Sequence, residues 1–406
     1  MAHGNGEDRT RPIGVGLSGT NLERAGDHNQ RVTLHAVRLN GPVQRTELAD
    51  ITGLTAPAIA NITRRLLNDG LIMESGRHHG ARGRAASKLV INPDSCFSIG
   101  VNVDRDHITI VVVDFVGRVR ARSSREVAFA MPDAVQSFFR HSIGQMLAKA
   151  NIDPARLIGI GVAFPDEMER TKLPEQPDDY AVWGSVAVDE LLSDVFPIPV
   201  YVENDAAAAA LGEMQFGLGH QYRSFFYILI TAALGGGLVV DGQYVRGANG
   251  RSGELGWLHG RDAAGNSRQL QNIVSLSALY SLLAREGYHV ASPRGLTRLD
   301  GRGRDIALGW VEASSETLVD TMLAINCLIN PEAVLIGGRL PSTLVDRLAD
   351  GLNRRLKPYA AQFPVIAPVA RALTSDDAPA VGAAILPFSK QLLPRRSVLM
   401  KTAMEA

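Results

Sequence analysis

The chain has 406 residues, 45% of them hydrophobic, with 42 basic residues against 42 acidic ones, values typical of a globular protein of two or three domains. Its two cysteines, Cys96 and Cys327, form no CxxC pair, which argues against a disulfide framework or a cysteine-based zinc site and favours a reducing cytoplasm. The polar N-terminus is unlike a signal peptide, and the longest apolar run, 225–240, is interrupted by three glycines, so we expect no membrane span.

The balanced total charge hides an uneven distribution along the chain. Residues 1–92 carry 12 Lys and Arg against 8 Asp and Glu, which leaves 30 against 34 for the remainder. A basic N-terminal module on an acidic body favours a polyanionic partner at one end of the protein.

The first residues of the chain are polar and rich in glycine. We expect residues 1–27 to be flexible and a first helix to begin at His28, with Asp27 as its N-cap. Gly41-Pro42 should end this helix. Two further helices are predicted near residues 45–51 and 55–68, and the turn between them contains Gly53. Two helices joined by a short turn with a glycine are typical of a helix-turn-helix.

The third predicted helix has one apolar face and one polar face. Its apolar residues recur at helical spacing and should face the core. Small and polar residues at the start of such a helix suit entry into the DNA major groove, where an Asn pairs with adenine and an Arg with guanine or phosphate. The residues that we expect to contact DNA are Thr55, Ala56, Ala58, Asn61, Arg64 and Arg65.

A basic wing is predicted to follow this helix. Two short strands flank a glycine-rich loop, and between Gly76 and Lys88 there is no acidic residue. The alternative interpretation is a solvated basic hairpin on a protein-interaction module. Because a helix-turn-helix and a wing occur together, residues 28–92 are predicted to form a winged helix-turn-helix that binds DNA. The wing residues that we expect to contact DNA are Arg77, Arg82 and Arg84.

The remainder, residues 93–406, is predicted to be an α/β domain with two similar lobes. Three strands (97–103, 108–114 and 118–127) precede alternating helices and strands. A similar order of strands and helices begins again at 225.

A polar corner, Glu203, Asn204 and Asp205, lies between a short strand and an alanine-rich helix. Ligands of open α/β sheets bind at the carboxyl ends of strands. Asp205 is therefore a candidate general base or a group that binds a hydroxyl. The alternative is that Asn204 or Asp205 only caps the helix.

Four motifs resemble those of the ROK family, which comprises repressors, open reading frames and sugar kinases. They are the segment that starts at Gly14 and continues through the first helices, PVYVENDAAAAALGE at 199–213, GGGLVVDGQYVRGANGRSGELG at 235–256 and NPEAVLIGG at 330–338. The resemblance covers nearly the whole chain. It implies a winged helix-turn-helix followed by a two-lobed, actin-like, ROK sugar-kinase-like domain.

The sequence departs from the family motifs at the residues that would hold ATP phosphates. The family's first phosphate motif has an Asp and two glycines, whereas this chain has Asn102 and then Asp104-Arg105-Asp106. The second motif is Thr231-Ala232-Ala233. Glycine lets backbone N–H groups approach phosphates, and carboxylates beside a polyanion repel it. We therefore expect neither ATP-dependent phosphotransfer nor any cofactor.

The family's sugar-binding residues are better preserved in this chain than its phosphate-binding ones. The family binds sugar hydroxyls with residues that correspond to Asn204, Asp205 and Glu254, and its closing Glu is Gln271 here. Its zinc-binding His and Cys residues are missing from 257–272, so we expect no metal. Trp257 stands at the position of the family's His. It either stacks on a sugar ring or fills the space of the lost zinc site.

Three functions follow as hypotheses. The leading one is a dimeric transcriptional regulator, a repressor of sugar uptake or metabolism genes, whose partners are operator DNA and a sugar or sugar-derivative effector. The second is a sugar kinase with Asp205 as the general base. The third is a DNA-binding scaffold whose body only dimerises.

Overall fold

The computed structural model describes residues 22–75, 87–166, 168, 176–374 and 377–394. The chain divides into two compact units, one of Met1–Asn92 with Ser389–Ala406 and one of Pro93–Phe388. Within the described residues, no helix is both long and apolar enough to cross a bilayer.

The first unit contains a winged helix-turn-helix, as predicted. Its elements are α1 (Leu22–Asn40), α2 (Arg45–Thr52), α3 (Ala56–Asn68), β1 (Ile72–Ser75) and β2 (Lys88–Ile91). The two strands pair antiparallel, with Ile72 opposite Ile91. Apolar side chains from all three helices and both strands are buried, among them Leu34, Val37, Leu48, Ile59, Leu66, Ile72 and Leu89.

Helix α1 corrects one expectation. It begins by Leu22, so Asp27 lies inside the helix and is not its N-cap. Arg31 of this helix donates hydrogen bonds to the carbonyl oxygens of Lys390 (3.2 Å) and Leu393 (3.3 Å). Residues 389–394 therefore belong with the winged helix, whereas the sequence predicted that all of 93–406 forms one domain.

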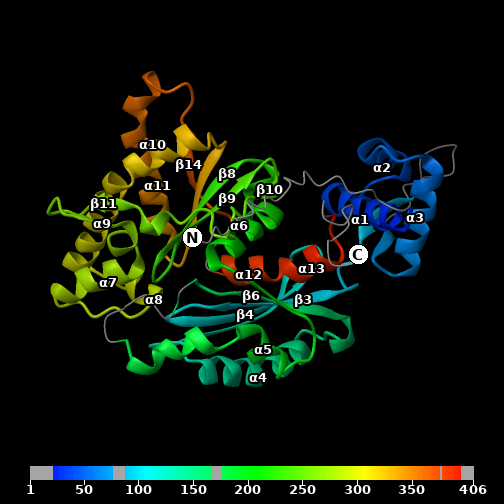
Figure 1. Ribbon diagram of the computed structural model, residues 1–406, viewed down its shortest axis with the longest axis horizontal. Coiled ribbons are helices and arrows are strands. Elements are labelled where there is room, and N and C mark those ends of the chain that lie inside the picture. The colour runs from blue at the N-terminus through cyan, green and yellow to red at the C-terminus, as the bar shows by residue number, and fades with distance from the viewer. Residues whose placement is uncertain (1–21, 76–86, 167, 169–175, 375–376, 395–406) are drawn as a thin grey trace, which may run out of the picture. The chain divides into compact units, whose positions relative to one another are not determined.

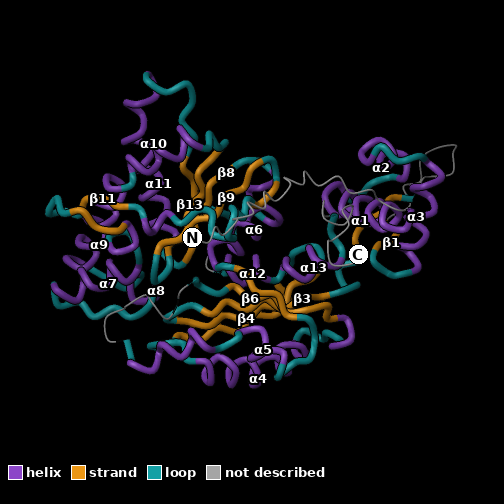
Figure 2. Tube along the Cα trace, viewed as in Figure 1, coloured by secondary structure: helices purple, strands orange, loops and turns teal. Residues whose placement is uncertain are grey.

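The second unit has two sheets with the same strand order, which confirms the prediction of two similar lobes (Figure 2). In each sheet three antiparallel strands are followed by two parallel ones. The first sheet runs β5-β4-β3-β6-β7, and its strands are β3 (Phe97–Val103), β4 (His107–Asp114), β5 (Val119–Glu126), β6 (Leu157–Ala163) and β7 (Val200–Glu203). The second runs β10-β9-β8-β13-β14, and its strands are β8 (Phe225–Ile230), β9 (Leu234–Val240), β10 (Gln243–Tyr244), β13 (Ala333–Gly338) and β14 (Val369–Arg371).

Helices cover both sheets (Figure 1). One face of the first sheet packs on α4 (Pro132–Lys149) and α5 (Val188–Ser193), and α12 (Ala378–Ala383) lies on its other face. The second sheet packs on α6 (Asp205–Phe216) on one side. Its other side has a large apolar core with α7 (Leu276–Arg285), α8 (Pro293–Leu296), α9 (Gly301–Thr317), α10 (Val319–Leu328) and α11 (Ser342–Leu356). The chain also has the hairpin β11 (His259–Arg261) and β12 (Ser267–Gln269), the helix α13 (Ile385–Gln391) and several short 3₁₀ helices.

The alanine-rich sequence of α6 is explained by its contact with α12. All five alanines, Ala206–Ala210, are buried. A Cβ added at Gly382 of α12 would lie 1.7 Å from the carbonyl oxygen of Ala208, so the two backbones are in direct contact there. Only very small side chains permit this approach. The helix that begins at the predicted polar corner is therefore packed between the second sheet and α12.

Candidate functional site

The exposed face of α3 carries the predicted DNA contacts. Thr55 is the N-cap residue, and Pro57 lies in the first turn, where its missing N–H costs nothing. Ile59 and Leu66 are buried, so the opposite face is exposed and presents Thr55, Ala56, Asn61, Arg64 and Arg65, with Ala58 half-buried. Arg64 donates a hydrogen bond of 3.3 Å to the side chain of Asn61.

Arg45 ties the helix-turn-helix to the wing, a role that sequence reasoning missed. Its guanidinium donates to the hydroxyls of Thr63 on α3 (3.1 Å) and Ser87 beside β2 (3.3 Å), and it pairs with Glu74 of β1 at 3.5 Å. These contacts hold α3 against the two strands of the wing. The wing loop itself, with Arg77, Arg82 and Arg84, lies outside the described residues.

The turn between α2 and α3 depends on a glycine. Gly53 caps α2 with φ = +68°, and its N–H donates to the carbonyl oxygen of Ala49. No atom would meet a Cβ at this position, so the requirement comes from the left-handed backbone and not from crowding.

Asn204 caps helix α6, as one of the two interpretations predicted. Its Oδ1 accepts hydrogen bonds from the N–H groups of Ala206 (3.0 Å) and Ala207 (3.1 Å). Its Nδ2 donates to Asp166 at 3.2 Å. The cap and a polar contact thus use different atoms of the same side chain.

Asp205 is almost completely buried at the first turn of α6. Its Oδ1 accepts a hydrogen bond of 2.8 Å from the N–H of Ala206. Burial, and then the nearby carboxylate of Asp104, raises the pKa of Asp205 to about 7, although Arg105 lowers it. A carboxyl group with this pKa exchanges a proton near neutral pH, so it is able either to donate to or to accept from a hydroxyl.

Ion pairs bring loops of the two lobes together at this corner. Asp166 follows the first sheet, and its carboxylate lies 3.9 Å from Arg251, which also donates to Glu254 at 3.1 Å. Glu203, at the end of β7, pairs with Arg246. Asn204, Asp166, Arg251 and Glu254 therefore form a continuous polar chain. Sequence reasoning had assigned roles to Asn204 and Glu254 but none to Asp166 or Arg251.

Trp257 lies one helical turn after Glu254, and Gln271 lies beside Gly256. Glu254 is the N-cap of the short 3₁₀ helix Leu255–Trp257. Trp257 is 45% exposed, so the interpretation that it fills the core is wrong. Gln271 is half-buried, and its Cβ would be 3.3 Å from a Cβ on Gly256. The amide of Gln271 donates to Gln269 at 3.1 Å.

The tip of the β3–β4 hairpin carries Asp104, Arg105 and Asp106, which the sequence predicts to stand where the family holds ATP phosphates. Asp106 lies 3.1 Å from the guanidinium of Arg339, which follows β13 in the other lobe, and Arg339 also pairs with Glu126. Although burial raises the pKa of Asp106, a hydrogen bond and charge interaction with His107 and the charge of Arg339 lower it below its ordinary value. The hairpin tip is thus paired with the guanidinium group of Arg339.

Comparison with known proteins assigns the chain to a family. Residues 98–390, more than two thirds of the chain, match the ROK family. The chain belongs to the ROK family.

The chain is also similar in sequence to three relatives of known or unknown function. It is 29% identical over 364 residues to an uncharacterised protein of Sinorhizobium fredii, a match that covers 89% of this chain and 90% of the relative. It is 27% identical over 229 residues to the xylose repressor of Bacillus spizizenii, where the match covers 56% of this chain and only 59% of the relative. It is 25% identical over 372 residues to the N-acetylglucosamine repressor of Escherichia coli, with 85% and 90% covered.

Two solved ROK structures show the fold. A ROK family transcriptional regulator, described as a homologue of the Escherichia coli MLC protein, aligns with a TM-score of 0.64 at 21% identity and covers 93% of this chain and 99% of that one. A ROK glucokinase from Streptomyces griseus aligns with a TM-score of 0.53 at 20% identity and covers 71% of this chain and 98% of that one. The first alignment extends further along this chain than the second.

The raised pKa of Asp205 predicts a pH dependence of stability. An unfolded Asp has a pKa of about 3.9, so the folded protein holds this proton more tightly. The associated stability is complete below about pH 4 and is lost as the pH rises through about 7. The loss amounts to at most roughly 4 kcal/mol, at about 1.4 kcal/mol per pKa unit.

Asp205→Asn should therefore flatten the dependence of the free energy of unfolding on pH between about 4 and 7. Urea unfolding at several pH values measures this. It can be followed by the fluorescence of the three tryptophans, Trp183, Trp257 and Trp310, which all lie in the Pro93–Phe388 unit. The exposed Asp179→Asn is the matched control and should leave the dependence unchanged. Equal curves for the wild type and Asp205→Asn would show that this carboxyl group is not responsible.

Proposed function

We propose that this ROK protein is a DNA-binding transcriptional repressor of sugar uptake or metabolism genes, with a body that senses a sugar or sugar derivative. The observation that carries the proposal is the presence, in one ROK chain, of a winged helix-turn-helix with Asn61, Arg64 and Arg65 exposed on α3. The xylose and N-acetylglucosamine repressors among its relatives support the same function.

The effector that suits the polar corner is a polyhydroxylated ring. Asp205 and Glu254 supply carboxyl groups, and Asn204 and Gln271 supply amides, which together accept from and donate to hydroxyls. Trp257, with its exposed ring, is placed beside Glu254 and is suited to stack on the apolar face of a sugar. Xylose, glucose and N-acetylglucosamine are the first sugars to test.

Binding of the effector must favour one conformation of the protein in order to alter its affinity for DNA. The ion pairs Asp166–Arg251 and Glu203–Arg246 join loops of the two lobes, so a ligand that rearranges them changes how the lobes close. We infer that the protein acts as a homodimer. A helix-turn-helix dimer reads two half-sites about one turn of DNA apart.

A sugar kinase is the second candidate, and one observation favours it. The pKa of Asp205, raised to about 7, suits a general base. Against it, Asp104 and Asp106 stand at the hairpin tip where ATP phosphates would need backbone N–H groups, and Arg339 is already bound to Asp106. We infer that phosphotransfer is absent. An ADP-release assay with a panel of hexoses and N-acetylhexosamines tests this, and activity that Asp205→Asn abolishes would establish the kinase instead.

Gel-shift titration of the full chain tests the DNA-binding part of the proposal. The probes are fragments upstream of the chain's own gene and of neighbouring sugar-uptake genes. We expect a complex with at least one fragment that survives an excess of unrelated competitor DNA. Binding that the competitor removes equally from every fragment would contradict the assignment as a repressor.

Calorimetry tests the sensing part. One sugar of the panel should release heat on binding to the wild type, and Glu254→Gln should weaken that binding by roughly 10-fold or more, because a hydrogen bond to a charged group contributes about 1.5–3 kcal/mol. The exposed Glu190→Gln is the matched control. No heat with any sugar would favour the third hypothesis, a DNA-binding scaffold.

A further inference from the structure

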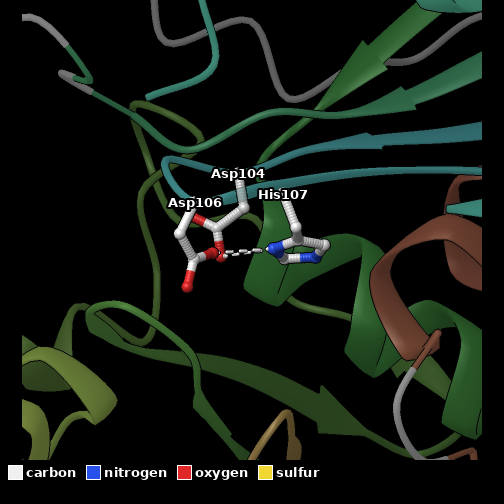
Figure 3. A group of neighbouring side chains, drawn as sticks. All are labelled: Asp104, Asp106 and His107. Atoms are coloured by element: carbon white, nitrogen blue, oxygen red, sulfur yellow. Dashed lines mark hydrogen bonds and ion pairs between the residues drawn. The ribbon is translucent and has the colours of Figure 1, made fainter. Parts of the chain in front are cut away.

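The tip of the β3–β4 hairpin gathers three metal-ligating side chains (Figure 3). They are Asp104, Asp106 and His107, and one candidate ligand atom from each lies within 4.8 Å of the other two. The side chains of Asp104 and His107 are only 1% and 2% exposed, and Asp106 is partly buried. Carboxylate oxygens and an imidazole nitrogen are ligands of Zn²⁺ and of related first-row ions.

The carboxylate of Asp104 has an oxygen that no hydrogen bond satisfies. Its Oδ1 accepts from the N–H of Arg105 at 2.7 Å, whereas its Oδ2 has no hydrogen-bond donor among the described residues. This Oδ2 faces His107 Nδ1 at 3.8 Å. A buried carboxylate oxygen without a donor costs free energy, so a cation or a water is expected there.

The orientation of the Asn102 side-chain amide is linked to the protonation of the His107 ring, because the amide faces Nε2 of that ring. Its Nδ2 lies 3.0 Å from His107 Nε2, and its Oδ1 is buried without a partner among the described residues. A half-turn of the amide exchanges Oδ1 and Nδ2: Oδ1 then lies against Nε2, where it accepts an N–H, and Nδ2 moves to the place without a partner among the described residues. In a neutral ring the Nδ1 lone pair then points at two carboxylates, which is repulsive unless a proton or a metal cation lies between them. Metal-binding histidines are oriented by this kind of hydrogen bond on the other ring nitrogen.

The separations of the ligand atoms fit a small ion. In a tetrahedral zinc site with bonds of about 2.0–2.1 Å, neighbouring ligand atoms lie about 3.3 Å apart. His107 Nδ1 is 2.8 Å from Asp106 Oδ1 and 3.8 Å from Asp104 Oδ2, so the two distances bracket that value. The third separation, between an oxygen of Asp104 and an oxygen of Asp106, is at most 4.8 Å.

The charges around the hairpin tip also suit a divalent cation. The carboxyl groups of Asp104, Asp106, Glu126 and Asp205 face the guanidinium groups of Arg105 and Arg339. The group has two net negative charges when all four carboxyl groups are ionised and one when Asp205 is protonated, and a divalent ion offsets either charge. The guanidinium of Arg105 lies 3.6 Å from Oδ1 of Asp104 and so leaves Oδ2 available.

We propose that Asp104, Asp106 and His107 hold a divalent first-row metal ion, with Zn²⁺ the best match for this ligand set. The ion replaces the proton on Nδ1 of His107, and Asn102 orients the ring from its other nitrogen. The fourth coordination position is open for water. The site differs in position and in ligands from the cysteine-rich zinc site that is missing from 257–272.

Metal binding by the untagged full chain tests the proposal. After chelation and dialysis against Zn²⁺ or Co²⁺, we expect one tightly held ion per chain and, with Co²⁺, the visible absorption of a tetrahedral site. His107→Gln and Asp104→Asn should remove this absorption. Asn102→Ala should keep it with about 10–100-fold weaker affinity, as for other residues that orient a metal-binding histidine. The exposed His259→Gln is the matched control and should change nothing.

Two results would overturn the proposal. One is a wild-type chain that retains no ion after dialysis and whose thermal midpoint does not respond to chelator or Zn²⁺, which decides the matter even if the variants fail to fold. The other is an ion that remains bound with the same spectrum in folded His107→Gln. After either result, the hairpin tip would contain a protonated His107 between Asp106 and Asn102 and no metal ion.

Discussion

Replacing Asn61 and Arg64 together by alanine is expected to abolish sequence-specific binding of DNA while the fold is retained. Both side chains are exposed on α3, and they are hydrogen-bonded to each other at 3.3 Å, so neither supports the core of the winged helix. A bidentate contact between a side chain and a base contributes about 1–3 kcal/mol of discrimination. The double variant should therefore bind its operator on the order of 100-fold more weakly, with little change in its affinity for unrelated DNA.

Fluorescence anisotropy with operator and scrambled duplexes measures both affinities. Arg65→Ala serves as a comparison, because a phosphate contact should weaken binding to both duplexes and lower the dependence on salt by about one counterion. The exposed Arg354→Ala, on α11, is the control for a general loss of positive charge. If the double variant lost affinity equally for both duplexes, α3 would not be the helix that reads the bases.

Glu213→Ala is expected to cause the largest loss of stability in the Pro93–Phe388 unit. This side chain is 0% exposed, and its carboxylate accepts hydrogen bonds from the N–H groups of Leu218, Leu373 and Thr374, each at 2.9 Å, and from the hydroxyl of Thr374 at 2.5 Å. Its removal leaves buried donors without a partner, so we expect a loss of about 3–5 kcal/mol.

The loss would act on the helix that positions the candidate site. Glu213 lies in the last turn of α6, whose first turn contains Asp205. Urea unfolding followed by tryptophan fluorescence measures the effect. Glu312→Ala is the matched control, because Glu312 is half-exposed and forms surface ion pairs with Arg354 and Arg355, which should contribute less than about 1 kcal/mol. Similar losses for the two variants would show that the buried hydrogen bonds contribute little.

Features that depend on local sequence were predicted well. The apolar spacing in 55–68 and the glycine at 53 predicted the helix-turn-helix, and both are present. The cap by Asn204 was one of two interpretations, and its two hydrogen bonds to the start of α6 confirm it. In each case the determining contacts lie within a few residues along the chain.

Features that depend on distant residues could not be predicted. Asp27 was predicted to cap a helix that begins at His28, but α1 begins by Leu22. Arg31 of α1 binds carbonyl oxygens more than 350 residues away, which no local pattern reveals. The contact of Arg339 with Asp106 joins the two lobes in the same way. It also gives Asp106 a partner, where the sequence suggested only an unfavourable charge.

The residues predicted to bind a ligand are only partly connected in the structure. Contacts of Asp166 and Arg251 join Asn204 and Glu254, and the roles of Asn204, Asp205 and Glu254 in sugar binding stay predictions. Roles for Trp257 and Gln271 in sugar binding stay predictions, as do the contacts of Arg77, Arg82 and Arg84 with DNA. An arginine three residues before Glu254 in a glycine-rich loop was the available signal for Arg251.

The proposal that a sugar regulates DNA binding is tested most directly by a titration of the operator complex with a sugar. Fluorescence anisotropy of a labelled operator, at constant salt and with the full chain, reports the affinity with and without xylose, glucose or N-acetylglucosamine. We predict that one of these sugars changes the affinity for DNA by about 5-fold or more, and that DNA changes the affinity for that sugar by the same factor. A sugar that binds the chain in calorimetry but leaves the affinity for DNA unchanged would contradict the account.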